Sequence, residues 1–402
     1  MSGVRVLVAA ALTAVLIPGC GGPILANPPQ SFPAPRATPA PTPGPTDPIP
    51  LAFPRDDGPH DRLTEWWYYT GHLRTAEGRR FGFEAVIFRA QRSAVPTAWA
   101  SHLALTDEAN DAFSYAQRSE VGPQVDHSPR DRAGVPIDGF DLRVSGLSPA
   151  LMAAGAPPVA PAPWRLVGTT SGARITAALM PEEARAAGAD FRLDLQLGTA
   201  DPVPHDGDGF VDFGPAGTSY YYSRMRQDVT GTLVLDGETL GVEGIAWFDH
   251  QWGDFISVGG GWDWFAINLD GPPDAQELPD PERTVDLTLS VVRDANGEPV
   301  LGYGTLDTPT GEPVRLDADD FEVSPLRTWT SPRTGRTWPS GWRITMSEME
   351  IVLEPTVLDQ ELDTRATTGV VYWEGSHRVS GTWARGEPVT GNSYVEITRY
   401  AE

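Results

Sequence analysis

One short stretch of this chain gathers aromatic and ionisable side chains more densely than packing alone requires. It contains Trp247, Asp249, His250 and Trp252, and it continues after a glycine run at 261–265. Tryptophan faces stabilise cations, a histidine can hold a proton or a water, and burial keeps a carboxyl group protonated. A site built from these groups could act as a general acid beside a cation-stabilising aromatic wall.

Strand alternation assigns these residues to faces. His250 and Trp252 are expected on one face and Asp249 on the opposite one. In the next strand, Asp263 shares a face with Phe265 and further apolar residues. If that face points inward, Asp263 is a protonated acid in an apolar setting and could donate a proton.

The sequence therefore gives two sets of candidates. The catalytic candidates are Asp263 as the acid, His250 as the group that holds water or shares the proton, and Trp252 as the wall that stabilises the cation. The candidate ligand-binding residues, nearly all aromatic, are Trp247, Trp262, Trp264, Phe265, Tyr222, Arg224 and Trp67. The alternative is architectural, because small barrels are filled by their own side chains.

Other chemistry has less support. The run from Glu65 to Tyr68 is typical of a barrel wall, and Glu65 is expected to pair with an arginine such as Arg89 or Arg224. The histidines at 60, 72, 102 and 205 lack the local spacing of metal ligands, so no metal is predicted. Ser223 lies outside a Gly-x-Ser-x-Gly elbow, and no glycine-rich phosphate loop is present.

Composition restricts the partners. The formal net charge is −24 over 402 residues, which disfavours nucleic acid and anionic membrane surfaces. With 42 glycines and 39 prolines, turns and strands are favoured over long helices.

The N-terminus resembles an export sequence. Residues 1–20 read as a signal peptide that ends at Cys20, the sole cysteine, in a lipobox-like setting. An ordinary signal peptide with a chance cysteine is the alternative. Residues 21–54 are rich in proline and predict a disordered tether that is dispensable for folding. We expect an envelope protein that touches a membrane only through a lipid on Cys20, or else a secreted or periplasmic one.

The remaining chain predicts an all-β protein. Short strands recur about every ten residues with turn residues between them, and one short helix is expected over 181–187, with Pro181 in its first turn. Two domains are expected, at 55–225 and 226–402, each an antiparallel barrel or sandwich.

Several motifs together resemble one family. They include Glu65-Trp66-Trp67-Tyr68-Tyr69-Thr70-Gly71-His72-Leu73, Tyr221-Tyr222-Ser223-Arg224-Met225, Asp249-His250-Gln251-Trp252-Gly253 and Gly391-Asn392-Ser393-Tyr394-Val395-Glu396. This pattern resembles the hydroxyneurosporene synthase (carotenoid 1,2-hydratase) family, also called AttH-like or lipocalin-like secreted hydrolases. The resemblance implies two packed lipocalin-like (calycin-type) β-barrels and no bound cofactor. It also implies, for some members, hydration of a terminal double bond, with His250 and Trp252 at positions implicated in the hydratases.

Three functions stay open at this stage. The first is a cofactor-independent hydro-lyase acting on an elongated apolar molecule, an isoprenoid or a lipid. The second is a non-catalytic carrier of such molecules, and the third is a secreted hydrolase of hydrophobic esters. An export sequence favours a substrate other than a carotenoid, because carotenoid synthesis belongs to the cytoplasmic side of the membrane.

Overall fold

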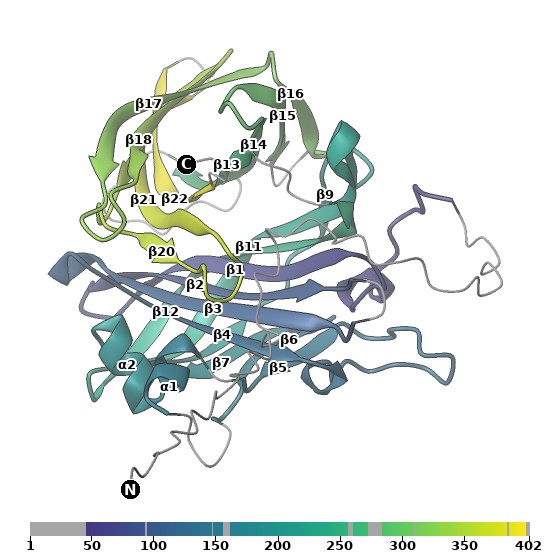
Figure 1. Ribbon diagram of the computed structural model, residues 1–402. Coiled ribbons are helices and arrows are strands. Elements are labelled where there is room, and N and C mark those ends of the chain that lie inside the picture. Colours follow the sequence, from purple (N-terminus) through teal and green to yellow (C-terminus); the bar gives the residue numbers. More distant parts are fainter. Residues whose placement is uncertain are drawn as a thin grey trace, which may run out of the picture.

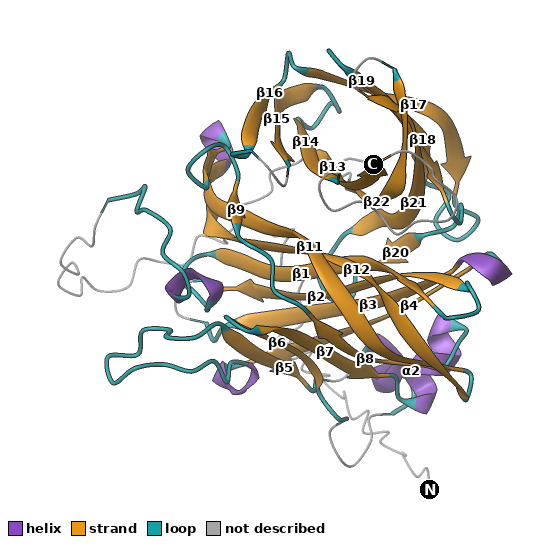
Figure 2. Cartoon of the chain, turned by 180° about the vertical axis from the view of Figure 1, so that it is seen from behind, coloured by secondary structure: helices purple, strands orange, loops and turns teal. Residues whose placement is uncertain are grey.

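The computed structural model describes residues 46–92, 95–146, 148–155, 161–255, 260–271, 284–308, 311–383 and 386–398. Antiparallel strands make up both of its bodies, and the helical turns are short (Figures 1 and 2). The all-β prediction is confirmed, and so is the helix at 181–187. The expected signal peptide, Cys20 and the first part of the tether lie outside the described residues.

The first body is a 12-stranded sheet that curls into a nearly closed barrel. Its path runs β4-β3-β2-β1-β12-β11-β8-β7-β6-β5, and β9 and β10 pair with β11. Its strands are β1 (Thr64–Arg74), β2 (Arg80–Ala90), β3 (Ala98–Asp107), β4 (Ala112–Val121), β5 (Phe140–Val144), β6 (Trp164–Thr169), β7 (Gly172–Ala178), β8 (Phe191–Leu197), β9 (Val203–Pro204), β10 (Phe210–Asp212), β11 (Gly217–Leu235) and β12 (Glu238–Phe255). The helices α1 (Pro149–Ala153) and α2 (Pro181–Ala187) lie in its connections, with the single 3-10 turns Arg55–Asp57, Glu108–Asn110, Pro123–Val125 and Gly214–Ala216.

The second body is a 10-stranded sheet that forms a half-barrel above the first (Figure 1). Its path runs β16-β15-β14-β13-β22-β21-β19-β18-β17, and β20 pairs with β21. Its strands are β13 (Gly261–Gly271), β14 (Val285–Arg293), β15 (Pro299–Asp307), β16 (Val314–Asp317), β17 (Phe321–Thr330), β18 (Thr337–Met346), β19 (Met349–Pro355), β20 (Glu361–Asp363), β21 (Val371–Trp383) and β22 (Glu387–Thr398).

The two bodies divide between 255 and 261, and not between 225 and 226 as the sequence suggested. The reason is the long hairpin of β11 and β12, which turns at Asp236 and Gly237, both with positive φ. Because β12 then pairs with β1 along its length, both strands of the hairpin belong to the first sheet.

The folded body also begins earlier than the expected boundary at 54. Asp47 pairs with Arg62 at 2.6 Å and accepts a hydrogen bond from the Tyr220 hydroxyl. The Phe53 ring meets the edge of the Tyr222 ring, with 4.8 Å between centroids. A proline-rich segment can still order itself where a few of its side chains find buried partners, and that is the case for 46–54.

Each body has its own apolar core, and a further cluster lies between them. The inward side chains of β1, β11 and β12 belong to the first core, and those of β13, β21 and β22 to the second. The outward side chains of β1 and β2 face the outward side chains of β13, β21 and β22. In the part of the chain that the structure describes, no helix is long and apolar enough to span a bilayer.

Candidate functional site

Strand pairing brings the inward face of the aromatic motif against two neighbouring strands. His250 of β12 lies opposite Trp67 of β1 and opposite Tyr222 of β11. Trp252 lies opposite Glu65 in the same way. Since cross-strand neighbours stand side by side on one face, residues far apart in sequence form one patch inside the first barrel.

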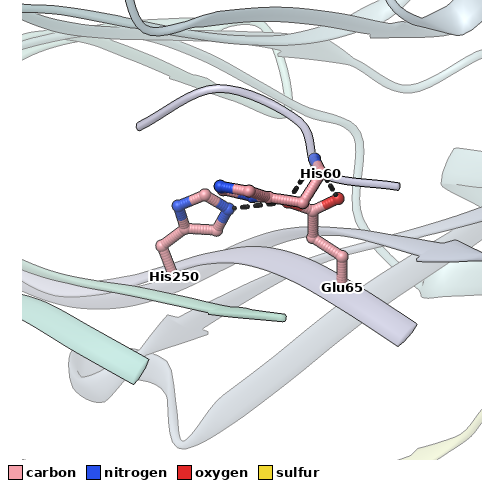
Figure 3. A group of neighbouring side chains, drawn as sticks. All are labelled: His60, Glu65 and His250. Atoms are coloured by element: carbon pink, nitrogen blue, oxygen red, sulfur yellow. Dashed lines mark hydrogen bonds and ion pairs between the residues drawn. The ribbon is translucent and has the colours of Figure 1, made fainter. Parts of the chain in front are cut away.

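The centre of this patch is a group of three side chains that we call the inner site: His60, Glu65 and His250 (Figure 3). Glu65 Oε1 lies 2.8 Å from His60 Nδ1 and 3.1 Å from His250 Nε2. The backbone N–H of His60 also donates to the Glu65 carboxylate, at 3.0 Å from Oε2. Glu65 and His250 are fully buried, and the His60 side chain is 19% exposed. One carboxylate therefore bridges two imidazoles.

Tryptophans hold both imidazole rings in place. The His60 ring stacks on Trp252 with 3.9 Å between centroids and 1° between planes. The His250 ring stacks on Trp67 at 4.8 Å. Both tryptophans are buried, so the rings have little freedom to turn.

A second layer of polar groups satisfies the far side of each ring. His60 Nε2 faces Asp56 Oδ1 at 3.5 Å, and His250 Nδ1 faces the Tyr222 hydroxyl at 3.3 Å. Tyr222 donates its own proton to Asp57 at 2.5 Å, and Arg224 also binds Asp57 at 2.8 Å. Beside this pair lies a cavity of about 20 Å³, which has room for about one water.

The environment shifts the pKa values of the inner site. Burial lowers the pKa of His60, but hydrogen bonds to Asp56 and Glu65 outweigh burial, so the pKa is raised above 6.5. Burial raises the pKa of Glu65, but hydrogen bonds from His250 and His60 leave it below 4.5. Burial lowers the pKa of His250 below 6.5, against the pull of Glu65. The inner site can therefore carry an ionised carboxylate and a charged His60.

The outward face of the same strands forms a second polar group. Asp249 accepts hydrogen bonds from Trp247 Nε1 and from the Tyr221 hydroxyl, both at 2.6 Å. Trp264 Nε1 of the second body donates to the same tyrosine at 3.0 Å. Burial raises the pKa of Asp249 to about 6. The motif thus serves both faces, with His250 and Trp252 inward and Asp249 between the bodies, as alternation predicts.

Three further carboxyl groups lie between the bodies, and we call them the interface carboxyls: Glu84, Glu374 and Glu396. Glu84 and Glu374 are fully buried, and Glu396 is half-buried. Burial raises the pKa of Glu84 and of Glu396 to about 8. Burial and the charges of the other two carboxyls raise the pKa of Glu374 well above 4.5. At neutral pH these groups are therefore protonated acids.

Aromatic side chains surround the interface carboxyls. Glu396 accepts a hydrogen bond from Trp262 Nε1 at 3.1 Å and stands opposite Trp264 in the neighbouring strand. Glu84 accepts a hydrogen bond from the Tyr372 hydroxyl at 2.9 Å, and Glu374 accepts one from Tyr68. The half-buried rings of Trp66, Phe88 and Trp262 pack at the margin of this cluster.

Known proteins share this sequence pattern and architecture. Residues 44–400 match the model of the AttH-like family. The chain belongs to the AttH-like family. The crystal structure of a putative AttH from Nitrosomonas europaea is similar over 89% of this chain and 99% of that one, with 28% identity and a TM-score of 0.68. Kievitone hydratase from Nectria haematococca is similar over 88% and 94%, with 18% identity and a TM-score of 0.62, which shows a shared fold. No curated protein matches the chain significantly.

The structure of this AttH-like protein distributes the predicted site residues over three places. Trp67, Tyr222, Arg224, His250 and Trp252 surround the inner site. Trp247, Trp262 and Trp264 lie between the bodies.

The third place is the core of the second body, where Phe265 and Asp263 lie. Asp263 shares the inward face with Phe265, as alternation predicts, but it forms an ion pair with Arg293 at 2.7 Å. The expected setting, a carboxyl among apolar groups only, is therefore not found at Asp263. Its strand also belongs to the second sheet, whereas His250 and Trp252 belong to the first.

Glu65 has partners that the sequence did not suggest. Arg89 lies 3.8 Å from its carboxylate, but the two histidines are closer, and Arg224 binds Asp57 instead. His60 was set aside because no local spacing marked it as part of a site. The spacing rule fails here because the partners come from different strands.

The geometry around Ser223 differs from that of a serine hydrolase. His205 Nε2 lies 2.6 Å from the Ser223 hydroxyl, but that hydroxyl donates to Asp249, and His205 Nδ1 faces the Thr305 hydroxyl at 2.9 Å. In a serine hydrolase the carboxylate orients the histidine and not the serine. Ser223 and His205 are also fully buried, so this group serves to hold the two bodies together.

Proposed function

We propose that this AttH-like protein is a hydratase that adds water to a carbon–carbon double bond of an apolar, unsaturated isoprenoid or lipid. The observation that carries the proposal is Glu396, a half-buried carboxyl between the bodies with a raised pKa, which contacts Trp262 and stands beside Trp264. An acid that stays protonated at neutral pH, beside two tryptophans, suits the protonation of an alkene. Its structural neighbour kievitone hydratase bears the name of a hydratase.

The chemistry needs only groups of the chain and water. Glu396 gives its proton to the less substituted alkene carbon, and the positive charge develops on the more substituted carbon. The faces of Trp262 and Trp264 stabilise this cation. A water oxygen then attacks the cation and passes one proton to the Glu396 carboxylate, which restores the acid. The product is a tertiary alcohol, and no oxidant, reductant or cofactor takes part.

The neighbouring groups support this acid. Burial disfavours the ionised form of Glu396, so the carboxyl is most readily ionised while a cation lies beside it. Trp66, Phe88 and Trp262 are half-buried, and they are the proposed point of entry for the apolar substrate. The location is also a proposal: export through the N-terminal segment, with a lipid on Cys20, would place the protein in the cell envelope.

The test uses purified protein with two substrate classes, an acyclic carotenoid and a prenylated aromatic compound, in water enriched in ¹⁸O. Mass spectrometry follows both product and retained ligand. We expect a product heavier by one ¹⁸O-labelled water, and loss of that product in Glu396→Gln with ligand retention kept. The matched control is Glu77→Gln, at an exposed turn residue.

Two outcomes decide against the proposal. If the wild type retains an apolar ligand and never converts it, the protein is a carrier. If Glu396→Gln hydrates as fast as the wild type, the acid lies elsewhere.

A further inference from the structure

The inner site has a donor geometry that the proposed hydration does not use. His60 Nδ1, His250 Nε2 and a Glu65 carboxylate oxygen all lie within 4.8 Å of one another. Within the described ranges, this is the one group of three such side chains whose donor atoms converge in this way. Two histidines and one carboxylate are the ligand set of many zinc and iron(II) sites.

The spacing of these atoms suits a single ion. Bonds of roughly 2.0–2.2 Å to a tetrahedral ion place its ligand atoms about 3.4 Å apart. The two separations from Glu65 Oε1 are 2.8 and 3.1 Å. These two separations must widen to admit an ion, all three donor atoms lie within 4.8 Å of one another, and the stacked tryptophans fix both ring planes.

The hydrogen-bond partners behind the two imidazoles determine where each ring carries its proton. Tyr222 has donated its only proton to Asp57, so its oxygen can only accept from His250 Nδ1. Asp56 is likewise an acceptor only: Arg55 donates to both of its carboxylate oxygens and the backbone N–H of Ala52 donates to Oδ2, so Oδ1 can only accept from His60 Nε2. Both rings must therefore carry their proton on the far nitrogen.

Where both imidazoles are neutral, this arrangement leaves the two near nitrogens without protons, and a proton on His60 would satisfy only one of the two contacts with Glu65. A neutral imidazole holds one proton, so His60 Nδ1 and His250 Nε2 each aim a lone pair at the Glu65 carboxylate. Three acceptors then meet at one point, which is unfavourable without a cation between them. A divalent ion removes the conflict and carries the same charge as the two extra protons that would otherwise be needed.

We propose that His60, Glu65 and His250 bind one divalent transition-metal ion, with Asp56 and Tyr222 orienting the two imidazoles from behind. A metal-bound histidine commonly donates its other N–H to a carboxylate or another acceptor in this way. Zinc is the expected occupant, since nitrogen and oxygen donors in this ratio suit it. The ion would fasten the segment before β1 to β1 and β12. The proposal does not depend on the hydratase function, because Glu396 lies on the other side of the first sheet.

The experiment uses untagged, chelator-treated full-length protein titrated with Co²⁺, whose visible absorption reports nitrogen ligation, followed by displacement with Zn²⁺. We expect one Co²⁺ per chain, stoichiometric displacement by Zn²⁺, and a higher thermal midpoint with Zn²⁺. His250→Gln and Glu65→Gln should lose the spectrum. Asp56→Asn should weaken binding by about 10–100-fold. His127→Gln, at an exposed histidine, is the matched control and should bind as the wild type does.

The wild type alone can overturn the proposal, whatever the folding of the variants. Absence of stoichiometric Co²⁺ or Zn²⁺ binding to the chelator-treated wild type would refute it. Unchanged binding by Glu65→Gln, which keeps the size and the accepting oxygen of the side chain, would place the ion elsewhere and refute it too.

Discussion

Replacement of Glu396 by glutamine should change how stability depends on pH. In the fold, the pKa of Glu396 is raised from its usual 4.5 to about 8, first by burial and then by the charge of Glu84. The unfolded chain therefore releases this proton near pH 4.5, whereas the folded chain keeps it up to about pH 8. A carboxyl with a raised folded-state pKa contributes stability below the unfolded-state pKa, and that contribution is lost as the pH rises through the folded-state pKa.

The useful window is pH 6.5 to 8. Below it, four buried histidines act in the opposite direction, because burial lowers their pKa values to about 3 and the unfolded chain takes up their protons; they are His72, His102, His205 and His377. The unfolded-state protonation of these histidines is the same in wild type and Glu396→Gln, so it cancels when the two proteins are compared. Between pH 6.5 and 8, one such carboxyl lowers the free energy of unfolding by about 2 kcal/mol, at about 1.36 kcal/mol per pH unit.

The assay is urea unfolding, followed by tryptophan fluorescence at several pH values between 6.5 and 8. Wild type should lose free energy of unfolding over this range, and Glu396→Gln should lose about 2 kcal/mol less. The amide oxygen can still accept from Trp262 Nε1, so the fold should persist. Glu77→Gln should follow the wild type. Parallel pH curves for wild type and Glu396→Gln would show that Glu396 is ionised in the fold, and the reasoning about a protonated acid would fail.

Three further results are expected. Trp252→Ala should lower the free energy of unfolding by about 3–5 kcal/mol, since a buried indole that stacks on His60 is lost; a loss under about 1 kcal/mol would contradict its burial. A chain that starts at residue 56 should unfold more easily than one that starts at Thr46, by about 2 kcal/mol, because the contacts of the half-buried Asp47 and Phe53 are removed; equal urea midpoints would contradict those contacts. Metabolic labelling with a fatty acid should mark the wild type and not Cys20→Ala; equal labelling of both would exclude a lipid on Cys20.

Local sequence patterns predicted much of the fold. Period-two alternation set His250 and Trp252 on one face of β12 and Asp249 on the other, and the structure agrees. A proline followed by helix-forming residues gave α2 its bounds. The Asp236-Gly237 pair is a strong hairpin motif. It indicates that β11 and β12 pair in one sheet, as the structure has them.

The candidate sites depend on strand pairing that no local sequence pattern specifies. Glu65 and His250 are 185 positions apart and meet because β1 pairs with β12 in one register. Glu396 stands beside Trp264 because the last strand returns to pair with β13. A shift of either register by one residue would turn these side chains to the opposite face.

The sequence by itself determined which residues alternate, where turns fall and that the chain forms antiparallel sheets, because these follow from side-chain size, polarity and backbone preference along a few residues. Only the tertiary structure decided which carboxyl is ion-paired and which is protonated. Both acids belong to the second sheet, Asp263 buried and Glu396 half-buried, but Arg293 pairs with Asp263, whereas tryptophan and two other carboxyls surround Glu396. Whether a buried acid keeps its proton depends on what packs against it, and strands far apart in the sequence supply those neighbours.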